Sequence, residues 1–152
     1  MQTSSAIRPY TFGEEVCNCA IHGLGIIFSV AGLAVLVSLS SKYGDLWTVA
    51  STAVFGVSMI LLYTASTLYH AVPYPRVKKV LKKFDHIAIY YLIAGSYTPF
   101  LLVNMRGPVG WSVFAVIWSL ALIGTVLKIV TSGSGTLSLI HISEPTRRTP
   151  IS

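Results

Sequence analysis

Charged side chains are scarce in this chain. Only 11% of its 152 residues are Asp, Glu, Lys or Arg, whereas 53% are hydrophobic. A soluble domain carries charges on about 25% of its residues. The composition therefore excludes an ordinary soluble domain and indicates an integral membrane protein.

Cysteine is nearly absent, which argues against a structural metal site. Cys17 and Cys19 are two residues apart, and the chain has no second cysteine pair. A structural zinc site usually needs four ligands, so this pair alone is insufficient. We expect both cysteines to be reduced thiols and assign no role to them.

Acidic residues are also few, which gives the chain a net charge of +6. This excess does not predict nucleic-acid binding, because five of the eleven basic residues lie in one short stretch between apolar runs. The five are Arg76, Lys78, Lys79, Lys82 and Lys83. In a membrane protein such a cluster marks the cytoplasmic side, and we expect it to contact anionic lipid head groups.

Four apolar runs are long enough to cross a bilayer, which takes about 20 residues. They cover residues of about 20–41, 46–70, 84–103 and 109–131. Runs of this length cross lipid as helices, so the sequence predicts an all-α integral membrane protein with four transmembrane helices. Residues 1–19 would then form a cytoplasmic segment, because the basic connection places the start of the chain on its own side. No cleavable signal peptide is evident.

Polar residues gather where three of these predicted helices meet the cytoplasmic side. Ser66 and His70 are four residues apart on one helix face at the end of the second run. Asp85 opens the third run. Glu15, Asn18 and His22 lie near the start of the first run and are candidates for the same site. Ionisable residues within membrane segments usually face the bundle interior and mark function.

Structural roles for these residues remain open at this stage. His70 could lie at the membrane interface, Asp85 could cap the third helix, and Ser66 could bond to a carbonyl one turn earlier. His86 lies about 100° around the helix from Asp85, so we expect it at the interface rather than in the site.

Three segments carry a resemblance to a known family. "EEVCNCAIHGLG", "ASTLYHAVP" and "KKFDHIAIYYLIAGSYTPFLL" resemble the bacterial haemolysin III family, part of the progestin and adiponectin receptor superfamily. The resemblance covers about residues 10–130 and implies a seven-helix bundle in the bacterial inner membrane with a cytoplasmic N-terminus. It further implies a zinc ion bound by His70 and by a His-x-x-x-His pair in the seventh helix. Ser66 and Asp85 would lie beside the metal as catalytic residues.

The resemblance leaves two functions open. One is zinc-dependent hydrolysis of an amide bond in a membrane lipid, with the site in the inner leaflet. The other is a non-catalytic role, either as a cytolysin or as a regulator of membrane homeostasis. Replacement of His70 or Asp85 should abolish the first function and spare the second.

The sequence departs from the family after its fourth apolar run. The remaining histidines, His22, His86 and His141, form no His-x-x-x-His pair. Residues 137–147, "LSLIHISEPTR", resemble the translated adapter of a transposase-based sequencing library. We therefore expect residues 132–152 to be a non-native or disordered tail. The chain would then be an inactive N-terminal fragment of the bundle that does not bind zinc stably.

Overall fold

The computed structural model describes residues 10–140 and, for residues 132–140, the backbone alone. Its elements are α1 (Phe12–Tyr43), α2 (Leu46–Ala71), α3 (Pro75–Pro99), a π-helical turn η1 (Phe100–Asn104) and α4 (Pro108–Ile140). All four long helices are apolar enough to cross a membrane. The prediction of an all-α membrane protein with four spanning helices is confirmed.

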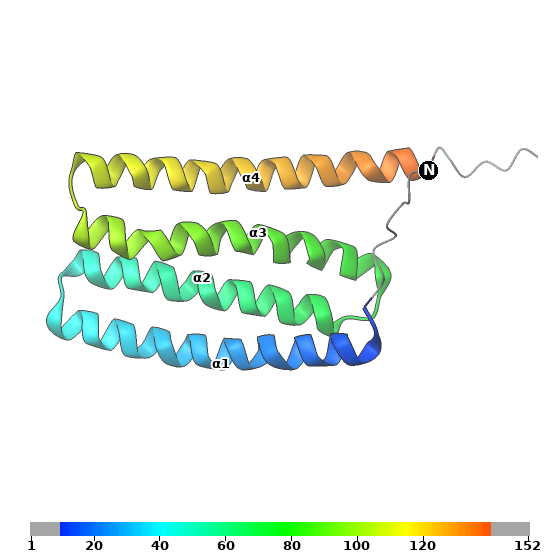
Figure 1. Ribbon diagram of the computed structural model, residues 1–152, viewed down its shortest axis with the longest axis horizontal. Coiled ribbons are helices and arrows are strands. Elements are labelled where there is room, and N and C mark those ends of the chain that lie inside the picture. The colour runs from blue at the N-terminus through cyan, green and yellow to red at the C-terminus, as the bar shows by residue number, and fades with distance from the viewer. Residues whose placement is uncertain (1–9, 141–152) are drawn as a thin grey trace, which may run out of the picture.

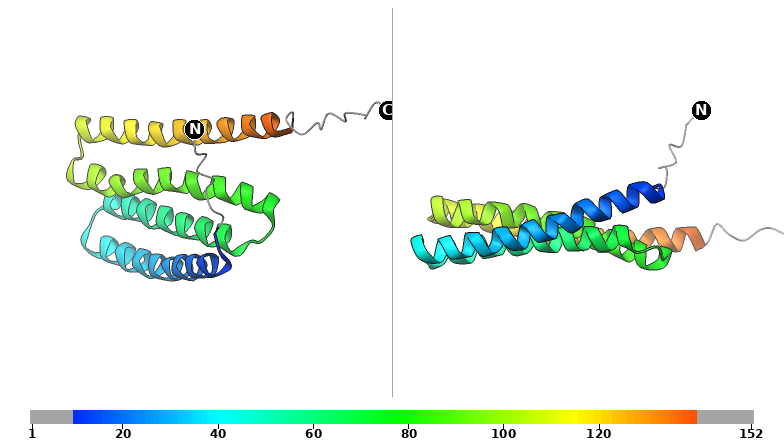
Figure 2. Two further views of the ribbon diagram at one scale, coloured as in Figure 1. Left: turned by 45° about the vertical axis from the view of Figure 1, so that its right-hand side comes forward. Right: turned by 90° about the horizontal axis from the view of Figure 1, so that it is seen from below.

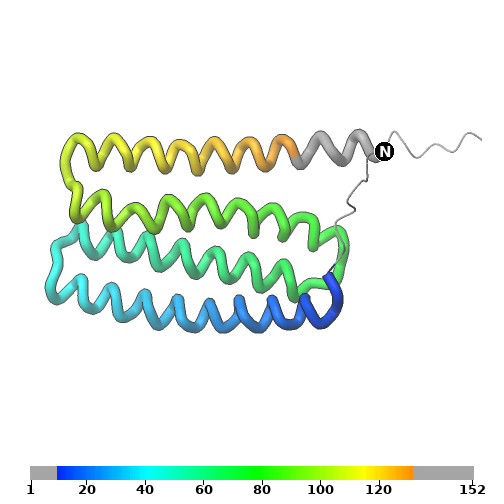
Figure 3. Tube along the Cα trace, in the orientation of Figure 1, coloured from blue at the N-terminus to red at the C-terminus, as the bar shows by residue number. Residues whose placement is uncertain are grey.

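The helices lie side by side in chain order and form a single layer (Figures 1 and 2). Within the described residues, the backbones of α1 and α2, of α2 and α3, and of α3 and α4 lie next to each other, whereas the backbone of α1 is a neighbour of neither α3 nor α4. Figure 3 shows how short connections reverse the chain between successive long helices. As a result, the start of α1, the end of α2 and the start of α3 share one end of the layer, here called the His70 end.

The first helix begins eight residues earlier than the predicted start at residue 20. Thr11 caps it: the Glu14 backbone N–H donates to Thr11 Oγ1 (3.3 Å), and the Thr11 N–H donates to Glu14 Oε2 (2.7 Å). This capping box satisfies two backbone donors and stabilises a polar first turn as helix. Part of the predicted N-terminal segment 1–19 is therefore helical. Hydropathy alone could not indicate this start, because the first turn is polar.

The third helix begins nine residues before the predicted start at residue 84. Pro75 stands in its first turn, where the fixed φ of proline suits a helix and its missing N–H costs nothing. The basic stretch is therefore helical rather than a loop. Asp85 lies in the third turn, and Tyr74 is the N-cap residue. The prediction that Asp85 could cap this helix is wrong for that reason.

The fourth helix continues past residue 131, where its apolar run ends, and reaches Ile140. Residues 132–140 thus have a helical backbone, whereas the rest of the predicted tail, including His141, lies outside the described residues. The non-native origin of residues 132–152 stays a prediction.

Candidate functional site

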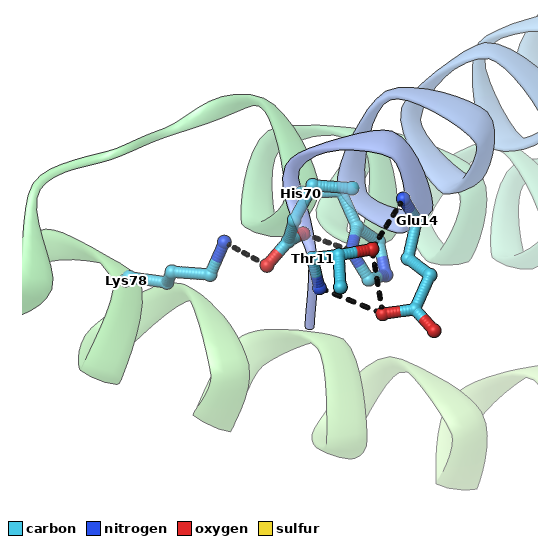
Figure 4. A network of polar contacts seen from close by, with 5 residues as sticks. Thr11, Glu14, His70 and Lys78 are labelled. Carbon is cyan, nitrogen blue, oxygen red and sulfur yellow. Dashed lines mark hydrogen bonds and ion pairs between the residues drawn. The ribbon is translucent and has the colours of Figure 1, made fainter. Parts of the chain in front are cut away.

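A polar cluster joins three helices at the His70 end. Nδ1 of His70, in the last turn of α2, lies 2.6 Å from Oε2 of Glu15 in the first turn of α1. Lys78, in the first turn of α3, donates from Nζ to Oε1 of the same carboxylate at 2.6 Å. Figure 4 shows Lys78 extending from α3 toward this contact. One carboxylate thus ties α2 and α3 to α1.

Aromatic rings enclose His70. Tyr69 and Tyr10 present T-shaped contacts, with ring centroids 4.7 Å and 5.7 Å from the imidazole. His22 of α1 stacks on the same imidazole with centroids 5.8 Å apart and planes 3° from parallel. The His70 side chain is only 8% exposed. An imidazole at a solvated helix end would be more open, so this burial argues against a purely interfacial role for His70.

His22 contributes a second imidazole to the cluster. Besides His70, it contacts the Tyr63 ring at 6.0 Å. Its Nδ1 is buried and has no hydrogen-bond partner, a condition that no other buried side-chain nitrogen or oxygen shares among the residues described. A buried nitrogen without a partner costs free energy, so such an atom calls for an explanation. An imidazole nitrogen without a partner can make a hydrogen bond to a ligand or bind a metal ion.

Ser66 lies one turn before His70 on α2 and is 5% exposed. The expected bond from a hydroxyl to a carbonyl one turn earlier is made by its neighbour, since Thr67 Oγ1 donates to the Tyr63 carbonyl at 2.7 Å. Ser66 makes no such bond within the described residues. The purely structural alternative for Ser66 is therefore not what the structure shows.

Asp85 is half-buried on α3, at the same end of the layer as the cluster. No hydrogen bond joins Asp85 to Ser66 or His70 in the part of the chain that the structure describes. The structure thus brings Asp85 to the His70 end without a direct bond to the cluster.

Two other residues differ in their environments. Asn18 lies half-buried on α1 between Glu15 and His22, and no contact of its side chain supports a role in the cluster. His86 Nδ1 donates to the Lys82 carbonyl on its own helix at 2.6 Å. One ring nitrogen of His86 is therefore bonded to the backbone of α3.

The described residues include no group of three or more His, Cys, Asp or Glu that could hold a metal ion. A catalytic zinc ion usually takes three protein ligands. The donor chemistry nevertheless fits part of such a site, because His70 and His22 are adjacent imidazoles and His22 has an unpartnered buried nitrogen. These residues could supply some of the ligands of a metal, with the others coming from further residues.

A cleft of about 500 Å³ opens beside the cluster. Its walls include Phe12, Val16 and Val72, and Glu15, His70 and Lys78 also line it. The cleft is mostly apolar, with the polar residues of the cluster at one side. A cleft of this volume and character is typical of a binding site for an apolar ligand with a polar group.

Two members of the cluster, Lys78 and Tyr69, were not predicted from the sequence. Lys78 was expected to face lipid head groups with the other basic residues, but it is paired with Glu15 instead. Tyr69 was not among the candidate residues, yet it is only 8% exposed and its ring packs against His70. The spacing of Glu15, Asn18 and His22 places them along one helix face, and this signal could have indicated the α1 side of the cluster.

Comparison with known proteins gives consistent matches. The family model described as "Haemolysin-III related" matches residues 10–143. The chain is 49% identical over 116 residues to "Hemolysin-3" of Bacillus cereus, covering 76% of this chain and 53% of that protein. It is 45% identical over 120 residues to "Hemolysin-3 homolog" of Bacillus subtilis (79% and 56%).

A more distant match is human "Monocyte to macrophage differentiation factor", 30% identical over 118 residues (74% and 48%). The chain thus spans about half the length of the curated relatives it matches. No solved structure gives a significant match.

Proposed function

The chain belongs to the haemolysin III family, and from this premise we propose that the whole protein is a zinc-dependent hydrolase that cleaves an amide bond in a membrane lipid. The observation that carries the proposal is the buried cluster at the His70 end. His70 is 8% exposed and Ser66 is 5% exposed, although both lie in an apolar helix. Polar groups placed at this depth are costly and usually functional.

The proposed roles follow from side-chain chemistry. A bound zinc ion would act as a Lewis acid that polarises a carbonyl group and activates water. His70 would be one of its ligands, and further ligands would come from outside the described residues. Asp85 can accept a proton from water as a carboxylate, and the Ser66 hydroxyl can donate a hydrogen bond to a substrate oxygen. His22, with its unpartnered nitrogen, is a candidate additional ligand.

The proposed site lies in the inner leaflet of the bacterial plasma membrane, with a cytoplasmic N-terminus. The basic residues at the start of α3 support this orientation, because positive charges favour the cytoplasmic side. Arg76, Lys79 and Lys82 are exposed there, and Lys83 is partly so. They would contact anionic head groups, whereas Lys78 is already paired with Glu15. Such contacts contribute about 1 kcal/mol per basic residue near the surface.

A non-catalytic role is the second candidate. Two of the relatives bear the name hemolysin, and a cytolysin or a regulator of membrane homeostasis would need no hydrolytic site. The two functions differ in their dependence on the polar cluster. A protein that only disrupts or regulates membranes would tolerate isosteric replacement of its polar residues.

The test compares His70→Gln and Asp85→Asn with the wild-type whole protein in mixed micelles that contain a fluorescent N-acyl sphingoid amide. We expect each variant to lose at least about 100-fold in hydrolysis rate, because Asp85→Asn removes the proposed proton acceptor and His70→Gln removes a proposed metal ligand. His86→Gln is the matched control and should keep full activity, because among the described residues His86 bonds to the backbone of its own helix. Equal rates in all four proteins, with erythrocyte lysis also unchanged, would favour the non-catalytic role.

A further inference from the structure

Glu15 is bonded through both of its carboxylate oxygens. Oε2 contacts Nδ1 of His70 and Oε1 accepts from Lys78, each at 2.6 Å. The Glu15 side chain is 18% exposed, so little water competes for these oxygens. Its position is therefore fixed by two helices other than its own.

The contact with His70 determines where the imidazole proton resides. An ionised carboxylate can only accept hydrogen bonds. The 2.6 Å contact is therefore a bond from Nδ1–H to Oε2, and the neutral imidazole has its lone pair on Nε2. In the absence of such a partner, an imidazole exchanges between its two tautomers.

We propose that Glu15 is a positioning residue that holds His70 as the Nδ1–H tautomer and so presents Nε2 to the site. The inference rests on the proposed function in one respect, the assignment of His70 as a metal ligand. A carboxylate that accepts from the far nitrogen of a ligating histidine fixes the ring orientation and raises the basicity of the other nitrogen. Glu15 occupies that place relative to His70.

Lys78 and the surrounding rings complete the arrangement. Lys78 Nζ lies 5.1 Å from the centroid of the Tyr69 ring, which limits the motion of the ammonium that holds Glu15. His22 covers one face of the His70 imidazole in a parallel stack, and the Tyr69 and Tyr10 rings approach it at steep angles. These contacts oppose a flip of the ring that would exchange its nitrogens. The cluster therefore fixes both the tautomer and the orientation of His70.

Nitrogen NMR of ¹⁵N-histidine-labelled protein in detergent micelles tests the assignment, with His70→Gln identifying the His70 signals. The wild type should show a protonated Nδ1 and an unprotonated Nε2. Glu15→Gln retains the shape of the side chain, but its amide can donate as well as accept. In this variant and in Glu15→Ala, the signals of both nitrogens should move toward the averaged values of a tautomer mixture.

Lys79→Met is the matched control, because Lys79 is the exposed neighbour of Lys78. It should leave the His70 signals at their wild-type values. If His70 has the same tautomer in the wild type, Glu15→Gln and Glu15→Ala, Glu15 does not select it and the inference is overturned. A wild-type His70 protonated on Nε2 would overturn it equally.

Zinc titration of the whole protein against a chromogenic chelator separates this inference from the proposed function. Glu15→Gln should weaken zinc binding by about 10- to 100-fold, as second-sphere changes do elsewhere. A wild-type protein that binds no zinc would contradict the metal assignment in the proposed function. The NMR result would still decide the role of Glu15, because it needs no metal.

Discussion

At the scale of single residues, two carboxylates in this chain are stabilised by basic partners that are distant in the sequence. Glu15 pairs with Lys78, and Asp45 pairs with Arg106 across 61 positions of sequence at the opposite end of the layer. Each pair links parts of the chain that are far apart in sequence. Their neighbours in the sequence do not indicate these partners.

Asp45 makes a pH-dependent contribution to the stability of the folded protein. It caps α2 by accepting from the backbone N–H and the hydroxyl of Thr48 at 2.9 and 2.7 Å, and it accepts from Arg106 at 2.7 Å. These bonds, chiefly those from Thr48, lower the pKa of the Asp45 carboxyl from 3.8 to about 2. A lowered pKa in the folded state stabilises the protein above the unfolded value, and that contribution is lost as pH falls toward 2.

We expect Asp45→Asn to remove part of the pH dependence of thermal unfolding in detergent between pH 4 and pH 2. Asparagine is also a good N-cap residue, so the substitution removes the charge and retains the cap. The measurement is the difference in unfolding midpoint between the two proteins at pH 5 and pH 2, followed by circular dichroism. The difference should shrink at pH 2, because the Asp45 carboxylate becomes protonated as the pH falls toward its pKa. It should also shrink in high salt, because Asp45 and Arg106 are both about half exposed and salt screens ion pairs at such positions. An equal difference at both pH values would contradict the assignment.

At the scale of the elements, small residues allow close helix contact between α2 and α3. Gly95 is buried on α3, and a Cβ built there would overlap the Ser58 side chain of α2, lying 2.9 Å from its Cβ. The helices thus approach each other at a position where only glycine fits without a shift. Small residues have this role at many helix contacts in membranes.

Gly95→Ala should therefore destabilise the protein by about 1–3 kcal/mol, the usual cost of overpacking. Gly32→Ala on α1 is the matched control, since a Cβ there meets nothing within 4 Å. The free energy of unfolding can be measured for both by titration from mild detergent into dodecyl sulfate. Adding Ser58→Ala to Gly95→Ala should recover part of the loss, because it removes the overlapping hydroxyl. If both glycine variants behave alike, the close contact does not govern stability.

At the scale of the whole molecule, the single layer of helices has two chemically different ends. The His70 end carries the basic first turns of α3, and the opposite end carries Asp45, Arg106 and Lys42. This asymmetry supports the proposed orientation, in which the His70 end faces the cytoplasm. The contact of the basic residues with anionic head groups depends on the same orientation.

Cysteine labelling tests the orientation. In a background with Cys17 and Cys19 replaced by serine, Lys79→Cys and Lys42→Cys place one thiol at each end of the layer. A membrane-impermeant maleimide should label Lys42→Cys in intact spheroplasts and Lys79→Cys only after permeabilisation. The reverse pattern would contradict both the orientation and the head-group contact.

The sequence by itself determined the class of fold and the region of the site. Apolar runs of about 20 residues can satisfy their backbone in lipid only as helices, so four runs predicted four spanning helices. Short connections make successive helices antiparallel, which brought Ser66, His70 and Asp85 to one end. These conclusions depend on local composition and chain direction, which are readable from the sequence.

Only the tertiary structure decided the helix starts and the partners of the polar residues. The capping box at Thr11 and the proline start at Pro75 extend helices beyond the runs that hydropathy detects. The Glu15 contacts with His70 and Lys78, and the stack of His22 on His70, require a particular rotation of three helices about their axes. That rotation is set by side-chain packing across the layer, such as the contact at Gly95, and packing depends on all the neighbouring surfaces together.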